Sequence, residues 1–306
     1  MTWGSYFFLL IMVLVGVAFI TLIEQKILGS MQIRVGPNYV GYWGVFQPFS
    51  DAVKLLSKES FNSRVATSLV YYTSPVAGLT LSLFLWAIYP FSDGGLSLSY
   101  SILFFMGISG MGIYAILGAG WVSNCKYSML GSLRAVAQMI SYEASLGTVF
   151  LSLVWLSNSF KFSYLIDSQY MVYNIFLLMP LGYIWLVSSL AETNRSPYDF
   201  AEGESELVSG FNTEYGSAGF VLIFMAEYAS ILLMSLLFSI LFLSSSFSTM
   251  VAVKTISVGF VFVWVRASLP RYRYDKLMGL AWKSFLPISL LLFFYYLSVG
   301  LSCSLF

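Results

Sequence analysis

The sequence predicts an all-α integral membrane protein, a bundle of eight transmembrane helices that forms a single transmembrane domain over residues 1–306. Three observations support this fold class. Hydrophobic residues make up 58% of the chain and charged residues only 9%, a composition typical of membrane proteins. Apolar stretches of about 20 residues, enough to cross a bilayer as a helix, recur between the charged residues. The basic residues gather in alternate loops, as expected when successive loops lie on opposite sides of a membrane.

Eight apolar stretches have the length that a transmembrane helix needs. The seventh contains Lys254, which is compatible with a span because a lysine near a helix end can extend its ammonium group to the interface. Without this span, the C-terminus would move to the other side of the membrane. The predicted spans cover residues 3–23, 68–90, 100–121, 136–157, 171–191, 218–242, 250–269 and 284–304.

The distribution of Lys and Arg predicts the orientation of these spans. If successive loops alternate sides, 13 of the 15 basic residues fall on one face and only Lys161 and Lys254 on the other. This is the positive-inside pattern, and it predicts both termini on the outer side of the membrane. The inner-face loops are then expected at about residues 24–67, 122–135, 192–217 and 270–283.

Several classes of protein and of site are excluded or disfavoured. Residues 1–23 carry neither an Arg-rich presequence nor the pattern of a signal peptide, so they are expected to be the first span. Cys125 and Cys303 are too few for a four-ligand iron–sulfur cluster, and they lie on different predicted sides, which argues against a disulfide. The chain has no histidine, the commonest metal ligand, and no phosphate-binding glycine loop. Any redox chemistry must therefore use electrons delivered by another protein.

The first inner loop, about residues 24–67, is much longer than a helix connection requires, which indicates a working segment. Pro48 lies where a first-turn proline is tolerated, and apolar residues follow it at helical spacing, with charged residues off the apolar stripe. This pattern predicts an amphipathic helix on the membrane surface, although a passive interfacial helix fits the periodicity equally well. The apolar positions are Phe49, Ala52, Val53 and Leu56, and the charged positions are Asp51, Lys54 and Lys58.

Glu143 and Glu227 are each the only charged residue inside a predicted span. A charged side chain at the bilayer centre costs about 2.5–3.5 kcal/mol on insertion scales, so an intramembrane acid indicates a functional site. Hydrogen-bonding residues, such as Tyr142 and Tyr228, are their neighbours in the sequence. These acids predict proton or ion handling. The alternative is a structural carboxylate that is hydrogen-bonded between helices.

The loop at residues 192–217 carries six acidic residues and a single basic residue, Arg195. Taken alone, such a loop is usually a solvated face. Here it begins where the fifth span ends and leads into the span with Glu227, which predicts a chain of carboxylates from the surface into the membrane. The acidic residues are Glu192, Asp199, Glu202, Glu204, Glu206 and Glu214.

Five long motifs distributed along the chain resemble one family. They are IRVGPNYVGYWGVFQPFSDAVKLLSKE, GSLRAVAQMISYE, ETNRSPYDFAEGESELVSGFNTEY, FMAEY and RYRYDKLM. The family is subunit 1 of NADH:ubiquinone oxidoreductase, respiratory complex I, in its animal mitochondrial form. The resemblance covers essentially the whole chain, and its motifs are long and specific.

The resemblance implies a core membrane subunit that forms much of the ubiquinone access tunnel and couples NADH:ubiquinone electron transfer to proton translocation. It implies ubiquinone as the substrate, no cofactor bound by this chain, and NADH, FMN and iron–sulfur clusters in partner subunits. The expected partners are the hydrophilic subunits of the quinone site, neighbouring membrane-arm subunits and lipids, with no nucleic acid. The expected location is the mitochondrial inner membrane, with both termini on the intermembrane-space side.

The same resemblance implies site residues, position by position, and it implies no catalytic or metal-binding residue in this chain. The residues expected to shape the quinone tunnel are Arg34, Asp51, Lys54, Arg195, Asp199, Phe224 and Arg273. The residues expected on a path that couples quinone reduction to proton movement are Glu143, Glu192, Glu202, Glu204 and Glu227.

The resulting hypothesis is that quinone reduction changes the protonation or position of the acidic loop, and that the buried glutamates pass this change on. Burial and like-charge neighbours favour the protonated form of a carboxyl group, and interacting acids titrate as a coupled set. Two other classes of function stay open. A stand-alone proton-coupled transporter can also use intramembrane acids, and in a structural membrane anchor the glutamates would affect stability alone.

Overall fold

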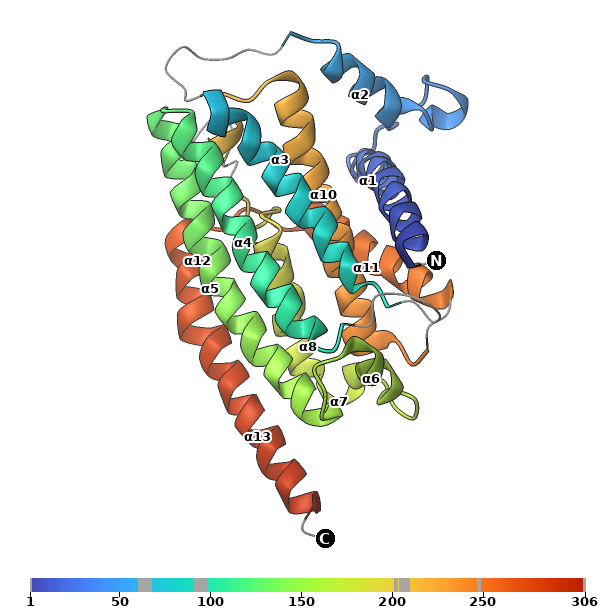
Figure 1. Cartoon of the computed structure of the whole chain (residues 1–306), viewed down its shortest axis with the longest axis vertical. Helices are drawn as coiled ribbons and strands as arrows, with labels where there is room; N and C mark the ends of the chain where they lie inside the picture. The colour runs from blue at the N-terminus through green and yellow to red at the C-terminus, as the bar shows by residue number, and fades with distance from the viewer. Residues whose placement is uncertain are drawn as a thin grey trace.

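The computed structural model describes residues 2–59, 68–90, 98–200, 203, 210–246 and 249–304. Within these ranges the secondary structure is helical, and they contain no β-strand. Figure 1 shows an elongated bundle, with the N-terminal helix on one side and the C-terminal helix extending beyond one end. The predicted all-α class is confirmed.

Seven helices of the described residues are long and apolar enough to cross a bilayer. They correspond to seven of the eight predicted spans, which makes the chain a multi-pass membrane protein. Their bounds are α1 Thr2–Met31, α3 Ser68–Leu85, α4 Ser101–Val122, α5 Lys126–Ser157, α10 Ser217–Phe238, α11 Thr249–Ser268, and α12 Tyr274–Leu280, which continues through the π-helical turn η5, Ala281–Phe285, into α13, Leu286–Ser304.

The predicted fifth span, residues 171–191, has a different form. It contains the short helices α7 (Asn174–Leu177) and α8 (Met179–Glu192), separated by the non-helical backbone of Leu178. Pro180 has no N–H to donate and is tolerated here because it lies in the first turn of α8. With 14 residues, α8 is shorter than the about 20 residues that a span requires. The count of eight spans stays a prediction.

A helix is present where the surface helix is predicted, as α2 (Gln47–Leu56), with Pro48 in its first turn. The segment before it turns sharply at Gly44, which has a φ of 72°. A Cβ atom on Gly44 would lie 2.3 Å from the carbonyl oxygen of Pro37, so only glycine fits this turn. The amphipathic contact of α2 with a membrane surface stays a prediction.

Two helices extend into segments where loops are expected. α1 continues past residue 23 to Met31, and α5 begins at Lys126, so most of the segment 122–135 is helical. The predicted spans end at the first charged residues, whereas a helix satisfies its own backbone hydrogen bonds and can continue into polar surroundings. Cys125, just before α5, is a free thiol, and the side chain of Cys303 lies outside the described residues.

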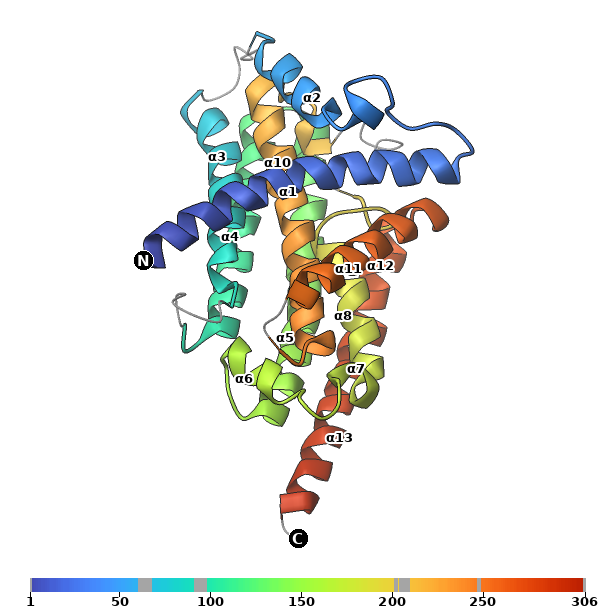
Figure 2. The ribbon, with the colours of Figure 1, turned by 90° about the vertical axis from the view of Figure 1, so that its right-hand side faces the viewer.

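The arrangement of the helices brings residues far apart in the sequence to one level of the bundle. α3, α4, α5 and α10 run along the long axis, whereas α1 crosses α10 steeply, as Figure 2 shows. α1 packs on α10 and α11, and α10 also packs on α3. Short elements complete the described fold: η1 Tyr42–Gly44, η2 Trp86–Ile88, α6 Phe162–Asp167, η3 Gly210–Asn212 and the π-helical η4 Ser239–Leu243.

Candidate functional site

Glu24 is buried on α1, although it follows the predicted first span and is expected in a loop. Its position continues the buried stripe of α1 that Val13, Val17 and Ile20 form, because residues three or four apart share one face of a helix. This spacing is the sequence signal that could have identified Glu24. Glu24 is thereby placed at the interface of α1 with α10 and α11.

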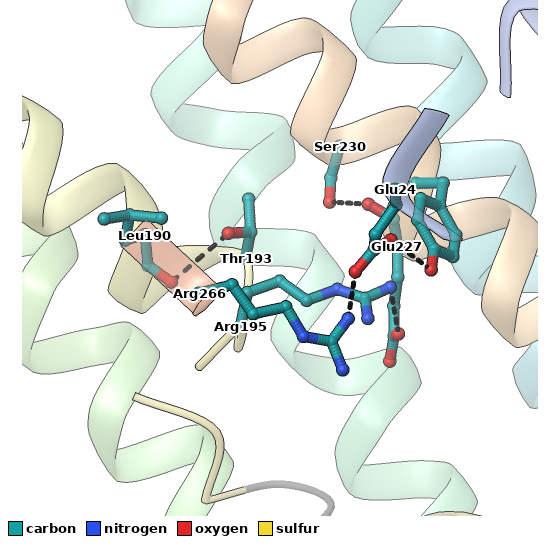
Figure 3. Close-up of polar contacts among 8 residues, drawn as sticks. Glu24, Leu190, Thr193, Arg195, Glu227, Ser230 and Arg266 are labelled. Carbon is teal, nitrogen blue, oxygen red and sulfur yellow. Dashed lines mark hydrogen bonds and ion pairs between the residues drawn. The ribbon is translucent and has the colours of Figure 1, made fainter. Parts of the chain in front are cut away.

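Glu24 belongs to a group of five side chains from four segments, which we call the charged cluster: Glu24, Arg195, Glu227, Tyr228 and Arg266. The hydroxyl of Tyr228 donates to Oε2 of Glu24 at 2.6 Å. The guanidinium of Arg266 forms an ion pair with the other carboxylate oxygen of Glu24, and Nη2 of Arg195 lies 3.5 Å from Oε2 of Glu227. Figure 3 shows both arginine side chains extending toward the two carboxylates.

Arg195 links the two ion pairs of the charged cluster. Its guanidinium carbon lies 4.3 Å from the centre of the Tyr228 ring, a cation–π contact, while Tyr228 itself bonds Glu24. The side chains of Arg195 and Glu227 are only 10% and 18% exposed. A buried charge without a partner costs several kcal/mol, so the balance of two acids and two arginines is what makes the cluster stable.

The end of α8 sets the position of Arg195. Asn194 adopts a left-handed conformation with a φ of 49°. The N–H of Asn194 donates to the carbonyl of Ala191 at 3.2 Å, and the N–H of Arg195 donates to the carbonyl of Leu190 at 3.4 Å. These two bonds form a Schellman motif, in which asparagine is tolerated at the left-handed position. The helix therefore stops here, and the chain turns toward α10.

The turn after α8 is also held by α5. Gln138 is fully buried, and its Nε2 donates to the carbonyl oxygens of Ala191 and Tyr198 at 2.7 and 2.8 Å. One side chain thus fixes both ends of the turn that carries Arg195. Sequence analysis did not identify Gln138, and its only signal is a polar side chain near Glu143 on α5.

The segment that follows the turn packs against the loop before α12. Nη2 of Arg271 lies 3.1 Å from Oδ2 of Asp199, and the N–H of Tyr272 donates to the carbonyl of Pro197 at 3.1 Å. Burial, with a smaller contribution from neighbouring Tyr272, raises the pKa of Tyr198 to about 12. The Tyr198 phenol is therefore neutral at physiological pH, and the start of the acidic segment is joined to the 270–273 loop by an ion pair and a backbone hydrogen bond.

A second group of acids, the Glu143–Glu192 pair, lies between α5 and the end of α8. Oγ of Ser109 donates to Oε1 of Glu143 at 3.4 Å. Oε2 of Glu192 is buried without a hydrogen-bond partner among the described residues, and the Glu143 carboxyl acts on Glu192 electrostatically. In the described part of the chain, neither acid forms an ion pair with Lys or Arg. The pair therefore lacks the compensation of the charged cluster.

Three cavities lie beside the two groups of acids. Glu192 and Ser109 line one of about 130 Å³, and Glu227 and Ser74 line one of about 60 Å³. A third, of about 20 Å³, lies in the charged cluster and shares Thr193 with the first. One water occupies about 30 Å³ of liquid, so the first two have room for water beside Glu192 and Glu227. These two cavities share the lining residues Gly78, Ala115, Ile116 and Ala226.

A fourth and larger cavity, of about 580 Å³, lies between α1, α2 and α10. Its lining is mostly apolar and includes Ala18 of α1 and Phe224 of α10. Asp51 and Lys54 of α2 also line it, as does Tyr228 of the charged cluster. The structure thus brings together three of the predicted tunnel residues, Asp51, Lys54 and Phe224, around one apolar space.

Other predicted site residues lie apart from these cavities. Arg34 donates from Nε to Oε1 of Gln32 at 2.8 Å, and Nε of Arg273 lies 3.2 Å from Oδ2 of Asp275 on the exposed surface. Neither arginine lines any of the four cavities. Glu202 and Glu204 lie outside the described residues, so their predicted roles stay predictions.

The arrangement suits proton chemistry more than metal chemistry. Glu143, Glu192 and Glu227 are protonatable groups near cavities that can hold water, and carboxyl groups bridged by water can exchange protons. Among the described residues, no group of three or more Cys, Asp or Glu side chains has the geometry of a metal site. The large apolar cavity, in contrast, suits a ligand with a long hydrophobic part.

Comparison with known proteins identifies relatives over nearly the whole chain. The family model for NADH dehydrogenase matches residues 5–297. NADH-ubiquinone oxidoreductase chain 1 of Anopheles gambiae is 54% identical over 294 residues, which cover 96% of this chain and 93% of that protein. The proteins of the same name from Locusta migratoria and Branchiostoma lanceolatum are 50% and 49% identical, over 99% and 91% of this chain and 96% and 89% of theirs.

Proposed function

This chain belongs to the family of NADH-ubiquinone oxidoreductase chain 1, a core membrane subunit of respiratory complex I, and we propose that it forms the ubiquinone access tunnel and a proton-coupling path. Its activity is therefore that of a subunit of an oxidoreductase, and its partners are the other complex I subunits. The family implies that cofactors are carried by partner subunits. In our proposal these cofactors are FMN and iron–sulfur clusters, with NADH as the electron donor.

The tunnel proposal depends on one observation, the apolar cavity of about 580 Å³ between α1, α2 and α10. Ubiquinone has a long apolar tail, and transfer of apolar surface from water into such a space is favourable. Asp51 and Lys54 supply polar groups on α2, with side chains 36% and 63% exposed, where a polar head group can pass. Phe224 contributes an aromatic wall, and its ring lies 4.3 Å from that of Phe220.

Filling this cavity tests the tunnel. Ala18→Trp places a large side chain in the cavity wall, and we expect the KM for ubiquinone to rise about tenfold, a loss of ~1.4 kcal/mol of binding. Met12→Trp is the matched control, because Met12 lies on α1, is 53% exposed and does not line the cavity. Native electrophoresis checks that both variants assemble. Equal KM values in both variants and the native complex would overturn the tunnel proposal.

For the coupling path, we propose that charge left by quinone reduction changes the acidic segment at Asp199, Glu202 and Glu204, and that Glu192, Glu143 and Glu227 pass this change on. The neighbouring cavities beside Glu192 and Glu227, which share lining residues, support the proposal. Arg195 supports it as well, because its turn lies between Glu192 and Asp199 in the chain and its side chain pairs with Glu227. Arg34 and Arg273 have the more peripheral role of shaping the tunnel surroundings.

We further propose that the segment from α7 to α8 is the eighth crossing, with both termini on the intermembrane-space side of the mitochondrial inner membrane. Two short helices that meet at a break can cross a bilayer where the broken backbone is buried in protein, and Leu178 at the break is fully buried. In this topology α2 lies on the inner membrane surface, among lipids. Family membership leaves no support for a stand-alone transporter.

A further inference from the structure

Two stacked tyrosines join α3 to the segment that precedes α10. The rings of Tyr71 and Tyr215 have centroids 4.5 Å apart and an interplanar angle of 6°. Their hydroxyls have different partners: that of Tyr71 donates to the backbone carbonyl of Glu214 at 2.8 Å, whereas that of Tyr215 lies 2.9 Å from Oγ of Ser74. Tyr215 and Ser74 are each only 6% exposed. A hydroxyl pair is therefore buried where α3 meets the start of α10.

Ser74 connects this pair with a carboxyl group. Ser74 and Glu227 both line the cavity of about 60 Å³, and Phe211, from the segment that carries Tyr215, closes another side. A buried water needs about 30 Å³ and two to four polar partners. The cavity offers this volume, and it offers the Ser74 hydroxyl and the Glu227 carboxylate as partners. Water in the cavity would complete a polar chain from Tyr215 to Glu227.

We propose that Tyr215 and Ser74 form a hydroxyl relay that passes protons between the segment at residues 210–216 and Glu227, through water in the 60 Å³ cavity. The inference rests on the proposed function, because it requires Glu227 to take part in proton coupling. It adds an access route from the protein surface at the start of α10, separate from the route through the Glu143–Glu192 pair.

The relay can be written as a balanced series of proton transfers. The cavity water gives one proton to the Glu227 carboxylate and takes one from Oγ of Ser74. The Ser74 oxygen takes the hydroxyl proton of Tyr215, and the Tyr215 oxygen takes a proton from a hydronium ion on the side of residues 210–216, which leaves as water. Each hydroxyl thus loses one O–H bond and forms another, so neither is ionised at the end. Burial raises the pKa of Tyr215, so its neutral form persists between transfers.

Variants in assembled complex I test the relay. Tyr215→Phe keeps the stacked ring and removes the hydroxyl, and Ser74→Ala removes the second hydroxyl. We expect each to lower coupled turnover about fivefold, the equivalent of one lost hydrogen bond of ~1 kcal/mol, to reduce protons pumped per NADH, and to raise the solvent deuterium isotope effect. Ser74→Thr, which keeps a hydroxyl, should retain native values. Tyr71→Phe is the matched control, since its hydroxyl bonds a backbone carbonyl, and it should also retain them.

The outcomes separate the relay from a structural role and from the proposed function. Native stoichiometry and isotope effect in Tyr215→Phe and Ser74→Ala would overturn the relay, as would failure of both to assemble, which would assign the pair to packing. Equal defects in Tyr71→Phe would also overturn the relay. Glu227→Gln, measured in parallel, tests the proposed function. If pumping is impaired in Glu227→Gln but native in Tyr215→Phe and Ser74→Ala, the relay alone is overturned. If pumping is native in Glu227→Gln, both the relay and the proposed role of Glu227 are overturned.

Discussion

The charged cluster and the Glu143–Glu192 pair are both largely buried groups of acids, but among the described residues only the cluster contains balancing cations. Glu24 and Glu227 each form an ion pair with an arginine. At the second site Glu143 accepts a hydrogen bond from Ser109, and Oε2 of Glu192 has no hydrogen-bond partner in the part of the chain that the structure describes. The two regions lie on neighbouring cavities, so the balance of acidic by basic side chains changes over a short distance.

This difference assigns different tasks to the two regions. Protonation of Glu227 would leave Arg195, whose side chain is only 10% exposed, without its partner, which is costly. Protonation of one member of the Glu143–Glu192 pair instead removes a charge that no described cation balances. Proton exchange is therefore cheaper at the pair than at Glu227, where proton uptake has to be coupled to release of Arg195. The fixed element of the cluster is the Glu24–Arg266 ion pair, which joins α1 to α11.

The largest effect is expected from Arg195→Met, which removes a charge from the cluster. Methionine keeps much of the length of the side chain, but Glu227 loses its ion pair and Tyr228 loses its cation–π contact. Removal of one partner from a buried ion pair costs about 3–5 kcal/mol. We expect little assembled complex in native electrophoresis, and a lower unfolding temperature for what assembles.

Arg273→Met is the matched control for this variant. Its ion pair with Asp275 is shorter than that of Arg195, 3.2 against 3.5 Å, but the side chains of Arg273 and Asp275 are 78% and 72% exposed. Exposed ion pairs contribute about 0–1 kcal/mol, so assembly should be normal. Equal losses of assembled complex in the two variants would show that burial does not determine how much these ion pairs stabilise the protein. A selective rise in the KM for ubiquinone in Arg273→Met would support its predicted place near the tunnel.

Glu143→Gln tests the uncompensated region. The exchange keeps the shape and the hydrogen bond with Ser109 and removes an acid that has no described cationic partner, so assembly should be normal. If Glu143 carries protons, coupled turnover and pumping should fall about 100-fold, the lower end of the range for loss of a proton-transfer group. The measurement combines NADH:ubiquinone reduction, proton pumping in membranes and native electrophoresis.

The same exchange at Glu24 provides the contrast. Glu24→Gln leaves Arg266 without its carboxylate, so we expect the assembly defect that Glu143→Gln lacks. Native pumping in assembled Glu143→Gln would demote that residue to a structural role. Normal assembly of Glu24→Gln would show that the charged cluster does not hold the helices together.

Much of this fold could be predicted from the sequence, because apolar length and charge position depend on local composition. Seven predicted spans appear as helices that can cross a bilayer, and Glu227 emerged from the same pattern. The proline-interrupted α7–α8 segment is less predictable, because its length depends on how surrounding helices bury the break. α1 and α5 continue beyond the predicted spans, because the predicted spans end at charged residues whereas a helix can continue into polar surroundings.

The site could be predicted only in part, for a physical reason. Glu227 and Asp199 are evident as acids in unusual positions, but their partners Arg195 and Arg271 are fixed by tertiary contacts that the sequence does not specify. Glu24 lies 242 residues from Arg266, and no local pattern connects them. Cavities are similarly invisible, because they arise from the mismatch of several packed surfaces. The linkage between Ser74, Tyr215 and Glu227 is of this kind.

The smallest effect is expected at the turn that positions Arg195, and it sharpens the comparison because charge is unchanged. Asn194→Ala replaces asparagine, which tolerates the left-handed conformation, with a residue that adopts it less readily, at a cost of about 1 kcal/mol. Asn158, at the end of α5, has a similar φ of 52°, so Asn158→Ala should lower the unfolding temperature about equally. Only Asn194→Ala should also reduce coupled turnover, because it moves Arg195 relative to Glu227. Asn194→Gly should restore the unfolding temperature and coupled turnover. Equal turnover in the two alanine variants would show that the cluster holds Arg195 in place without help from its turn.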